Sequence, residues 1–337
     1  MRAEDTMLST EFFLAFQRKG WRPKAVAVRH ERDLVAILYG WERTFLGVPT
    51  GVVYADGSLD SVLLADPLHH KHAFCAAIET LLASRGIRSL RLRVPRSGKD
   101  FDGVMQLTSS ASREVQYFPT EDLSSPLWKN HAHLALAETY DQFLRTLGGT
   151  TRHNFRYYRR RFEASHHSFV EHLSMDELRS AVLLLLPKSK RTAHFRETWI
   201  DRQISIMTAT GRPLAVGLKH KGGEWLSVLG GSYMPGGATL RFQCNNENQS
   251  GYDSLSVVLR GYLIELLIRQ GLKELVIWAD TGPPLSRYVT YAHTIEVRVD
   301  VTSRSWRMVR AIISAVEPLL PNRLADAAHW ITGQSHL

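Results

Sequence analysis

The sequence has 337 residues, which is enough for about two domains of ordinary size. Its 44% hydrophobic and 22% charged residues are typical of a folded soluble protein, and they exclude disordered, collagen-like and coiled-coil chains. Lys and Arg number 42 against 33 Asp and Glu. The resulting net charge of +9, with neutral His, favours anionic partners such as phosphates, nucleic acid or a membrane surface.

The two cysteines, Cys75 and Cys244, are too few for a disulfide framework or a zinc module, which favours a reducing compartment. Glu4 and Asp5 stand where a signal peptide carries positive charge. No apolar stretch approaches the roughly 20 residues of a membrane-spanning helix. We therefore expect a cytoplasmic protein, with peripheral contact at the inner membrane face left open.

In chain order, the first half begins with a meander of short alternating strands, predicted over residues 24–29, 34–41 and 44–54. An apolar-striped helix follows, ends at Gly86 and leads into a strand over 88–94. The second half repeats this order. Its strands are predicted over 213–219, 224–233 and 238–244, with two Gly-Gly turns between them; its helix ends at Gly271 and its last strand covers 273–279.

The two halves also match residue by residue at a constant offset of 185. The matching positions are Ile78, Leu81, Leu82, Gly86, Ile87, Leu90 and Leu92 on Leu263, Leu266, Leu267, Gly271, Leu272, Leu275 and Ile277. With a similar meander upstream of each, this match indicates a duplicated unit and a paired-domain protein.

Between the halves lies a strongly basic segment. A short helix over 139–147 is predicted, with Thr139 as its N-cap, and a second helix from Thr150 or Thr151 to Ala164. Between Gln142 and Phe162 the chain has no acid and six arginines: Arg145, Arg152, Arg156, Arg159, Arg160 and Arg161. The i, i+4 spacing of Arg152, Arg156 and Arg160 makes a basic stripe, opposite an apolar face of Phe155, Tyr158 and Phe162. Such a stripe indicates either a bound anion or acids supplied from elsewhere in the fold.

The meander, helix and final strand resemble the unit of the GNAT acyltransferase superfamily. More specifically, the chain resembles the tandem-GNAT proteins of the CelD/BcsL-type and FemAB-like group. The resemblance covers roughly residues 24–291 and is most specific in the basic segment, 133–163, and from Gly211 to Asp280.

This resemblance implies an α/β (α+β) fold with two GNAT-like domains, each a mixed, mostly antiparallel sheet flanked by helices. The expected divisions are an N-terminal domain over 1–137, an Arg-rich helical connector over 138–165, a C-terminal domain with the donor site over 166–300, and a helical extension over 301–337. The connector is expected to line the cleft between the two domains. The extension is amphipathic and basic, so it either packs on the second half or docks on a membrane surface.

The resemblance also implies acetyl-CoA or another acyl-CoA as donor. In the superfamily a Gln/Arg-x-x-Gly-x-Gly/Ala turn binds the CoA pyrophosphate, whereas this sequence has only one glycine there and an acid. Unpaired N–H groups at the start of the following helix suit phosphate oxygens. Asp253 or Ser254 can alternatively be a simple N-cap. The candidate donor-binding residues are Gln249, Ser250, Gly251, Asp253 and Ser254.

Acyl transfer also needs an oxyanion donor and proton transfer at the acceptor. Polar residues at the ends of the second-half strands are the candidates for catalysis: Tyr233, Glu247, Asp280 and Tyr288. Arg287 is the nearest match to a basic residue that follows the last strand in the resembling group. Asn245 lies in a polar tract, 243–249, that either binds the acceptor or is a surface loop.

The candidate substrate- or anion-binding residues are Arg152, Asn154, Arg156, Arg160, Asn245 and Arg287. No metal site is predicted, because the His-rich stretches 69–72 and 166–167 lack other ligands at suitable spacing. Cys244 has no basic neighbour to lower its thiol pKa, which argues against a nucleophile. Walker, Rossmann and hydrolase motifs are absent from the sequence.

The sequence therefore predicts an acyltransferase that moves an acetyl or other acyl group from acyl-CoA to an amine or hydroxyl on a small-molecule, sugar or peptide acceptor. One alternative is a FemAB-like transferase that uses aminoacyl-tRNA. The other is a non-catalytic module whose Arg-rich helix binds nucleic acid or anionic lipid. No stable protein partner is implied.

Overall fold

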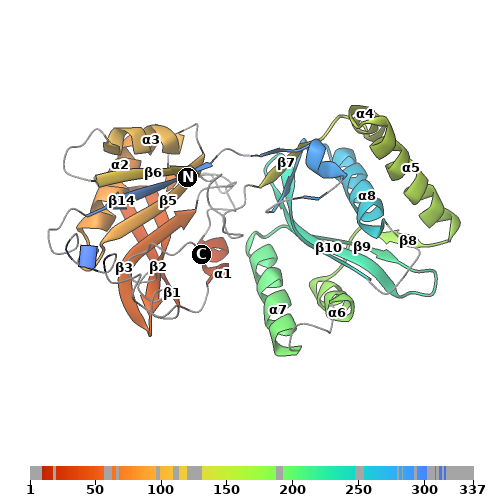
Figure 1. Cartoon of the computed structure of the whole chain (residues 1–337), viewed down its shortest axis with the longest axis horizontal. Helices are drawn as coiled ribbons and strands as arrows, with labels where there is room; N and C mark the ends of the chain where they lie inside the picture. Colours follow the sequence, from red (N-terminus) through yellow and green to blue (C-terminus); the bar gives the residue numbers. More distant parts are fainter. Residues whose placement is uncertain are drawn as a thin grey trace. The chain divides into compact units, whose positions relative to one another are not determined.

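The computed structural model describes residues 10–17, 20–56, 63–65, 68–95, 99–108, 114–119, 131–186, 193–246, 254–278, 281–282, 284–291 and 294–301, with 308, 311, 312 and 315. The chain divides into two compact units, each with its own sheet (Figure 1). The first unit comprises Met1–Ala3, Gln17–Asn130 and Ala292–Leu337. The second unit comprises Glu4–Phe16 and His131–Tyr291.

The sheet of the first unit has the strand order β1-β2-β3-β5-β14-β6, with β4 paired to β2. Only the β3–β5 pair is parallel among the described strands. Helix α2 connects the β3–β4 segment to β5. The elements are β1 (Trp21–His30), β2 (Asp33–Phe45), β3 (Val48–Asp56), β4 (Leu63–Ala65), α2 (His70–Ala83), β5 (Ser89–Pro95), α3 (Lys99–Thr108), β6 (Glu114–Pro119) and β14 (Thr294–Asp300).

The sheet of the second unit has the strand order β13-β7-β12-β11-β10-β9-β8, and only β11–β12 is parallel among its described pairs. The helices are α1 (Thr10–Ala15), α4 (Tyr140–Thr146), α5 (Gly149–Ala164), α6 (Met175–Leu185), α7 (Ala193–Ala209), α8 (Leu255–Arg269) and the 3-10 helix η4 (Leu285–Arg287). The strands are β7 (Ala132–Ala135), β8 (Ser168–Val170), β9 (Pro213–Lys219), β10 (Trp225–Met234), β11 (Gly237–Asn245), β12 (Glu274–Ile277) and β13 (Thr290–Tyr291).

The duplicated unit predicted from the sequence is present in both sheets. In each copy an antiparallel meander is followed by a helix that crosses over to a strand parallel to the last strand of the meander. Gly86 and Gly271 follow the two helices with φ of 89° and 75°, the left-handed conformation that favours glycine. The α/β fold class, with two mixed sheets flanked by helices, is confirmed.

Each sheet contains one strand from a segment that the sequence analysis assigned to the other domain. Strand β14, which follows the second unit, inserts between β5 and β6 of the first. Strand β7, which follows the first unit, pairs with β12 of the second. The expected assignment of residues 166–300 to one domain therefore fails at β14, and the expected first domain, 1–137, extends past the start of β7. Hydrogen-bond partners of these strands lie far away in sequence, so strand patterning alone could not assign them.

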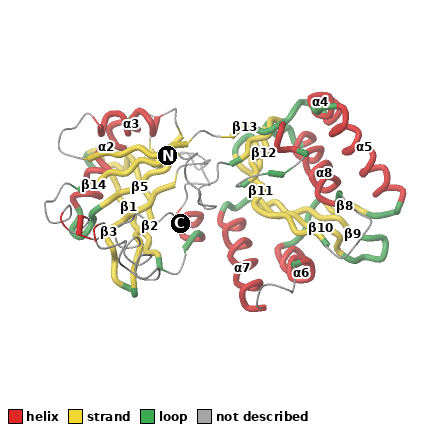
Figure 2. Tube along the Cα trace, viewed as in Figure 1, coloured by secondary structure: helices red, strands yellow, loops and turns green. Residues whose placement is uncertain are grey.

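Helices cover both faces of the second sheet (Figure 2). Residues of α4, α5 and α8 form one core with the sheet, and residues of α6 and α7 form another on the opposite face. The Arg-rich segment predicted as a connector over 138–165 is thus part of the second unit, where Phe155 and Phe162 are buried. Helix α5 begins at Gly149 with Gly148 as N-cap, two residues before the predicted Thr150 cap and three before the alternative Thr151 cap.

Candidate functional site

Strands β11 and β12 separate in the middle of the second sheet. They pair in parallel from Gly237 and Glu274 to Leu240 and Ile277, and the Trp278 N–H donates to the Leu240 carbonyl at 2.8 Å. Beyond that point β11 continues to its end paired only with β10 among the described residues. Among the described strands, residues 242–245 of β11 therefore have no neighbour on the side away from β10, and we call this side the open edge, towards which alternate backbone N–H groups point.

A β-bulge marks the same point. Gly230 of β10 lies opposite Phe242 and Gly231 lies opposite Leu240, so Arg241 is an extra residue on β11. Because side chains alternate between faces, one extra residue reverses the alternation beyond it. Phe242 accordingly packs with α6 and α7, although Leu240, two residues earlier, packs with α8.

The reversed alternation turns polar side chains of β11 towards α8. Gln243 and Asn245 form a hydrogen-bonded group with Ser227 of β10 and Arg260 of α8. The Ser227 Oγ donates to Asn245 Oδ1 at 2.6 Å, and Gln243 Nε2 donates to the same oxygen at 3.1 Å. Arg260 Nε donates to Gln243 Oε1 at 3.1 Å, and its Nη1 donates to the Thr281 Oγ1 at 2.8 Å. We call these five residues the splay network.

Arg260 bridges the gap between the two strands, because Gln243 lies on β11 and Thr281 follows β12. Its side chain is half-buried, and burial lowers the pKa of the guanidinium. No carboxylate of the described residues forms an ion pair with it. The splay network is therefore a cationic, partly desolvated group at the open edge of β11.

Helix α8 is the next described element after β11 in the sequence. Ser254 is its N-cap, and the Ser254 carbonyl accepts from the N–H groups of Val257 and Val258. The Ser254 side chain makes no capping hydrogen bond, so the predicted side-chain cap is not formed. The other predicted donor-binding and loop residues lie outside the described residues: Glu247, Gln249, Ser250, Gly251, Asp253 and, after β12, Asp280.

Tyr233 lies at the other end of β10 from the splay network. It is opposite Ala238, whereas Ser227 is opposite Asn245, and six residues of strand correspond to roughly 20 Å. Its hydroxyl accepts from Gln270 Nε2 at 3.3 Å, beyond the C-terminal end of α8. The structure does not bring this predicted catalytic tyrosine together with the network.

Tyr288 lies at the start of α5. Its hydroxyl accepts from the Gly148 N–H at 2.9 Å and donates to Thr151 Oγ1 at 3.3 Å. The hydrogen bond with Thr151 and the one from Gly148, together with the charge of exposed Arg287, lower the pKa of the hydroxyl below its ordinary value. Neither Arg287 nor Tyr288 is hydrogen-bonded to the splay network in the described part of the chain, so Asn245, Tyr233 and Tyr288 lie in three separate places.

Two of the arginines of the basic segment have acidic partners. Arg159 pairs with Glu163 at 2.9 Å and Glu265 at 2.7 Å, and its guanidinium lies 4.3 Å from the Tyr262 ring centroid. Exposed Arg156 lies 3.6 Å from Asp141. For Arg156 and Arg159, the fold therefore supplies the acidic partners that the sequence analysis gave as the alternative to a bound anion.

The other arginines of that segment have no ion pair among the described residues: Arg145, Arg152, Arg160 and Arg161. Beside them, exposed Tyr157 stacks on His153 with ring centroids 5.8 Å apart. Asn154 is half-buried on the same helix. The surface of α5 therefore combines positive charge with an exposed aromatic stack, and we call it the α5 surface.

The remaining chemical candidates are accounted for by packing. Cys244 is buried on the α6–α7 side of β11, and burial raises the pKa of its thiol to about 12, which agrees with the expectation that it is not a nucleophile. Within the described ranges no three His, Cys, Asp or Glu side chains are grouped so as to hold a metal ion.

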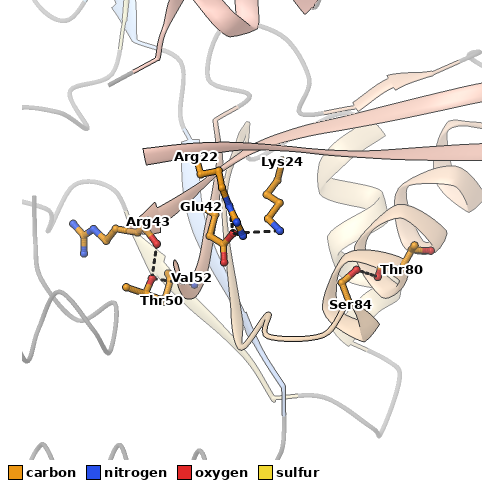
Figure 3. A network of polar contacts seen from close by, with 8 residues as sticks. All are labelled: Arg22, Lys24, Glu42, Arg43, Thr50, Val52, Thr80 and Ser84. Carbon is orange, nitrogen blue, oxygen red and sulfur yellow. Dashed lines mark hydrogen bonds and ion pairs between the residues drawn. The ribbon is translucent and has the colours of Figure 1, made fainter. Parts of the chain in front are cut away.

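The corresponding strands of the first unit do not separate in this way. There β3 stays paired with β5 from Val52 to its end at Asp56. Its neighbouring buried charge is also neutralised within the sheet: Glu42 accepts from Arg22 and Lys24 (Figure 3). Among the described residues, the open edge of β11 and the nearby Arg260 without an ion pair therefore have no counterpart at β3 and β5 of the first unit.

Sequence reasoning located the end of β11 but missed Ser227, Arg260 and Thr281. Asn245 was identified through the polar tract at residues 243–249. The available signal for Arg260 was a lone charged residue in the otherwise apolar segment 257–264, a position that an amphipathic pattern assigns to solvent. The bulge that turns β11 towards it has no sequence signature here.

No protein-family model and no curated protein matches the sequence. Solved structures do match. FemX superposes with a TM-score of 0.61 at 10% identity, over 90% of this chain and 94% of FemX. L-PGS from Bacillus licheniformis has a TM-score of 0.53 at 13% identity, over 85% of each chain. A conserved protein of unknown function from Bacteroides thetaiotaomicron has a TM-score of 0.55 at 9% identity, over 89% of this chain and 92% of that one.

These likenesses extend over both units and show that this chain shares the fold of FemX and L-PGS. At such low identities they establish the fold alone. None of the helices in the described residues combines the length and the apolar character needed to cross a bilayer.

Proposed function

We propose that this chain is an acyltransferase that moves an acetyl or other acyl group from acyl-CoA to an amine or hydroxyl acceptor, at the open edge of β11 in the second unit. The observation that carries the proposal is the separation of β11 from β12 at the bulge, beside the start of α8. It supplies, within one part of the fold, the groups that acyl transfer requires.

The start of α8 suits the phosphates of the donor. The first N–H groups of a helix lack partners within the helix, and its dipole places partial positive charge there. Helix α8 is 15 residues long and begins at Leu255, after the end of β11. A CoA pyrophosphate at this end leaves the thioester free to reach the gap between β11 and β12.

The open edge of β11 suits the reacting carbonyl. The acceptor nitrogen or oxygen attacks the thioester carbon, the carbonyl oxygen becomes negative, and the carbon–sulfur bond then breaks to release the CoA thiolate. A backbone N–H fixed by the strand stabilises that oxygen with little reorganisation. The backbone N–H groups of residues 242–245 that face away from β10 are the donors that we assign to this role.

Proton transfer from the acceptor to the thiolate needs a residue that titrates near neutral pH. Glu247 and Asp280 are our candidates, since they adjoin Asn246 and Thr281 at the two edges of the gap in the sequence. Tyr233 and Tyr288 remain predictions but are less suited, because neither is hydrogen-bonded to the splay network. Neutral Gln243 and Asn245 suit binding of the acceptor rather than proton transfer.

The test is release of CoA from acetyl-CoA by the full chain with a panel of amines, sugars and short peptides. We expect thiol release with at least one acceptor. Glu247→Gln and Asp280→Asn are each expected to lower kcat with little change in KM for acetyl-CoA, whereas Glu224→Gln, on an exposed turn, is the matched control. Absence of acetyl-CoA binding together with absence of thiol release across the panel contradicts the proposal.

A second candidate is a FemAB-like transferase that uses aminoacyl-tRNA, and the α5 surface favours it. Four arginines without ion pairs in the described residues and an exposed Tyr157–His153 stack suit a phosphate backbone and unstacked bases. A catalytically inactive module that binds nucleic acid or anionic lipid would use the same surface.

One triple variant distinguishes the tRNA-dependent transferase from the inactive binding module. Replacing Arg152, Arg156 and Arg160 with Glu is expected to abolish tRNA binding if α5 contacts it, and wild-type affinity should then fall steeply with salt. A matched control is Arg179→Glu, an exposed α6 residue paired with Asp201. Loss of aminoacyl transfer favours the tRNA-dependent enzyme, and lost tRNA or vesicle binding without any transfer activity favours the module. Unchanged binding excludes both.

A further inference from the structure

Several arginines of the described residues are paired with carboxylates, whereas half-buried Arg260 is not. In the first unit Arg298 Nε donates to Asp300 Oδ1 at 3.0 Å, and in the second unit Arg159 lies 2.7 Å from Glu265. Arg260 instead donates to two neutral oxygens, those of Gln243 and Thr281. A desolvated guanidinium stays charged, so an unneutralised one carries a desolvation cost that a bound anion offsets.

We propose that Arg260 binds a carboxylate carried by the acyl acceptor, so that the substrates of this site are amines or alcohols that also bear a carboxylate. This inference rests on the proposed acyl transfer in the second unit and specifies its acceptor class. A guanidinium has five N–H donors. Two are used by Gln243 and Thr281, and the remaining three have no acceptor among the described residues.

The orientation of the splay network adds a second donor. Because a guanidinium only donates, the Gln243 atom that faces Arg260 is the oxygen, and Gln243 Nε2 therefore points to Asn245 Oδ1. That oxygen also accepts from the Ser227 hydroxyl. The Asn245 Nδ2 group is then directed away from the network, with no acceptor in the described part of the chain. Arg260 and Asn245 thus present N–H donors on the same face of the sheet, a set that suits a carboxylate.

The phosphates of the acyl donor are a second source of an anion for Arg260. The position of Arg260 along α8 distinguishes them from a carboxylate on the acceptor. Arg260 follows the N-cap Ser254 by six residues, which corresponds to about 9 Å along the helix axis. Its hydrogen bonds lead to the gap between β11 and the segment after β12, where the acceptor must approach the thioester. This position favours an acceptor group over a pyrophosphate at the helix start.

The experiment measures binding of succinate and of its neutral analogue succinamide to the full chain by ligand-observed NMR, with calorimetry of acetyl-CoA in parallel. We expect succinate to bind at least tenfold more tightly than succinamide. Arg260→Met is expected to weaken succinate binding at least tenfold, since charged hydrogen bonds are lost, and to change acetyl-CoA affinity less than twofold. Arg269→Met, an exposed position on the same helix paired with Glu171, is the matched control and should change neither.

Gln243→Glu provides a second variant that does not remove the arginine. It places a carboxylate against Arg260 Nε, so the protein neutralises its own charge. We expect unchanged or raised thermal stability and at least tenfold weaker succinate binding.

Succinate affinity that is unaffected by both variants overturns the proposal. A tenfold loss of acetyl-CoA affinity in Arg260→Met also overturns it, and assigns the anion to the donor's phosphates. Absence of acetyl-CoA binding to the wild-type chain contradicts the proposed function. The carboxylate site at Arg260 is tested independently by the succinate measurements.

Discussion

The β-bulge between β10 and β11 depends on a glycine, and Gly231→Ala tests how far the site depends on the bulge. A Cβ at Gly231 would lie 1.9 Å from the Thr239 carbonyl oxygen, well inside van der Waals contact. The obstacle is backbone of the partner strand and not the end of a flexible side chain. The strands must therefore separate or change register to admit a methyl group.

Overpacking of this kind costs about 1–3 kcal/mol. In a unit of this size each kcal/mol lowers Tm by about 2–4 °C, so we expect a fall of roughly 2–12 °C in differential scanning calorimetry. Loss of the bulge would also displace the backbone N–H groups of residues 242–245, which we assign to the thioester carbonyl, and we expect acetyl-CoA affinity to fall at least tenfold. Gly149→Ala is the control, because a Cβ there meets no atom within 4 Å.

The reasoning is refuted if Gly231→Ala has the Tm and the acetyl-CoA affinity of the wild-type chain. A lowered Tm with unchanged affinity would retain the packing argument and remove the link between bulge and site. In Gly149→Ala we expect a Tm equal to or above that of the wild type, since Ala is the better helix former by up to about 1 kcal/mol.

Three further predictions concern stability. Deleting residues 293–337 removes the three buried aliphatic side chains of β14. Each contributes roughly 1.5–3 kcal/mol of burial free energy, and their sum approaches the stability of a whole domain. Limited proteolysis should therefore show the first unit degraded, and intact protease resistance would contradict the strand assignment. Phe155→Ala should cost about 3–5 kcal/mol in urea unfolding and exposed Tyr157→Ala less than about 0.5; equal effects would contradict the packing of α5 on α8. Burial and the charges of the neighbouring basic residues lower the pKa of His167 below 6.5, so the folded state binds fewer protons than the unfolded state. The free energy of unfolding should therefore decrease as pH falls from 7.5 to 5.0, and His167→Gln should reduce this dependence. Identical pH profiles of the variant and the wild type would refute the prediction.

Local features of the fold were predictable because their signals are local. Thr139 is the predicted N-cap: it accepts from the Gln142 N–H, and the Gln142 side chain accepts from the Thr139 N–H, which completes a capping box. The strand over 213–219 has the predicted bounds, since Lys219 precedes a Gly-Gly turn. Phe155 and Phe162 are buried as helical spacing indicates.

Features that depend on distant partners were not predictable. The alternation of β14 identifies a strand, but nothing in residues 294–300 specifies that it pairs with β5 rather than with its own half. The α5 helix was expected to be a separate connector because its charge dominates its composition, whereas Phe155 against Gly261 of α8 decides its place.

The candidate site divides in the same way. Asn245 was identified because polar residues cluster at the end of its strand. Arg260 was missed, since its role follows from a one-residue register shift between two other strands.

Calorimetric titration of the full chain with acetyl-CoA tests the central claim most directly. The strand separation occurs in the second unit, while β3 of the first unit stays paired with β5 to its end. We therefore predict saturable binding with one acetyl-CoA per chain, weakened at least tenfold by Gly231→Ala. Two sites per chain, no binding, or one site unaffected by that substitution would contradict the account.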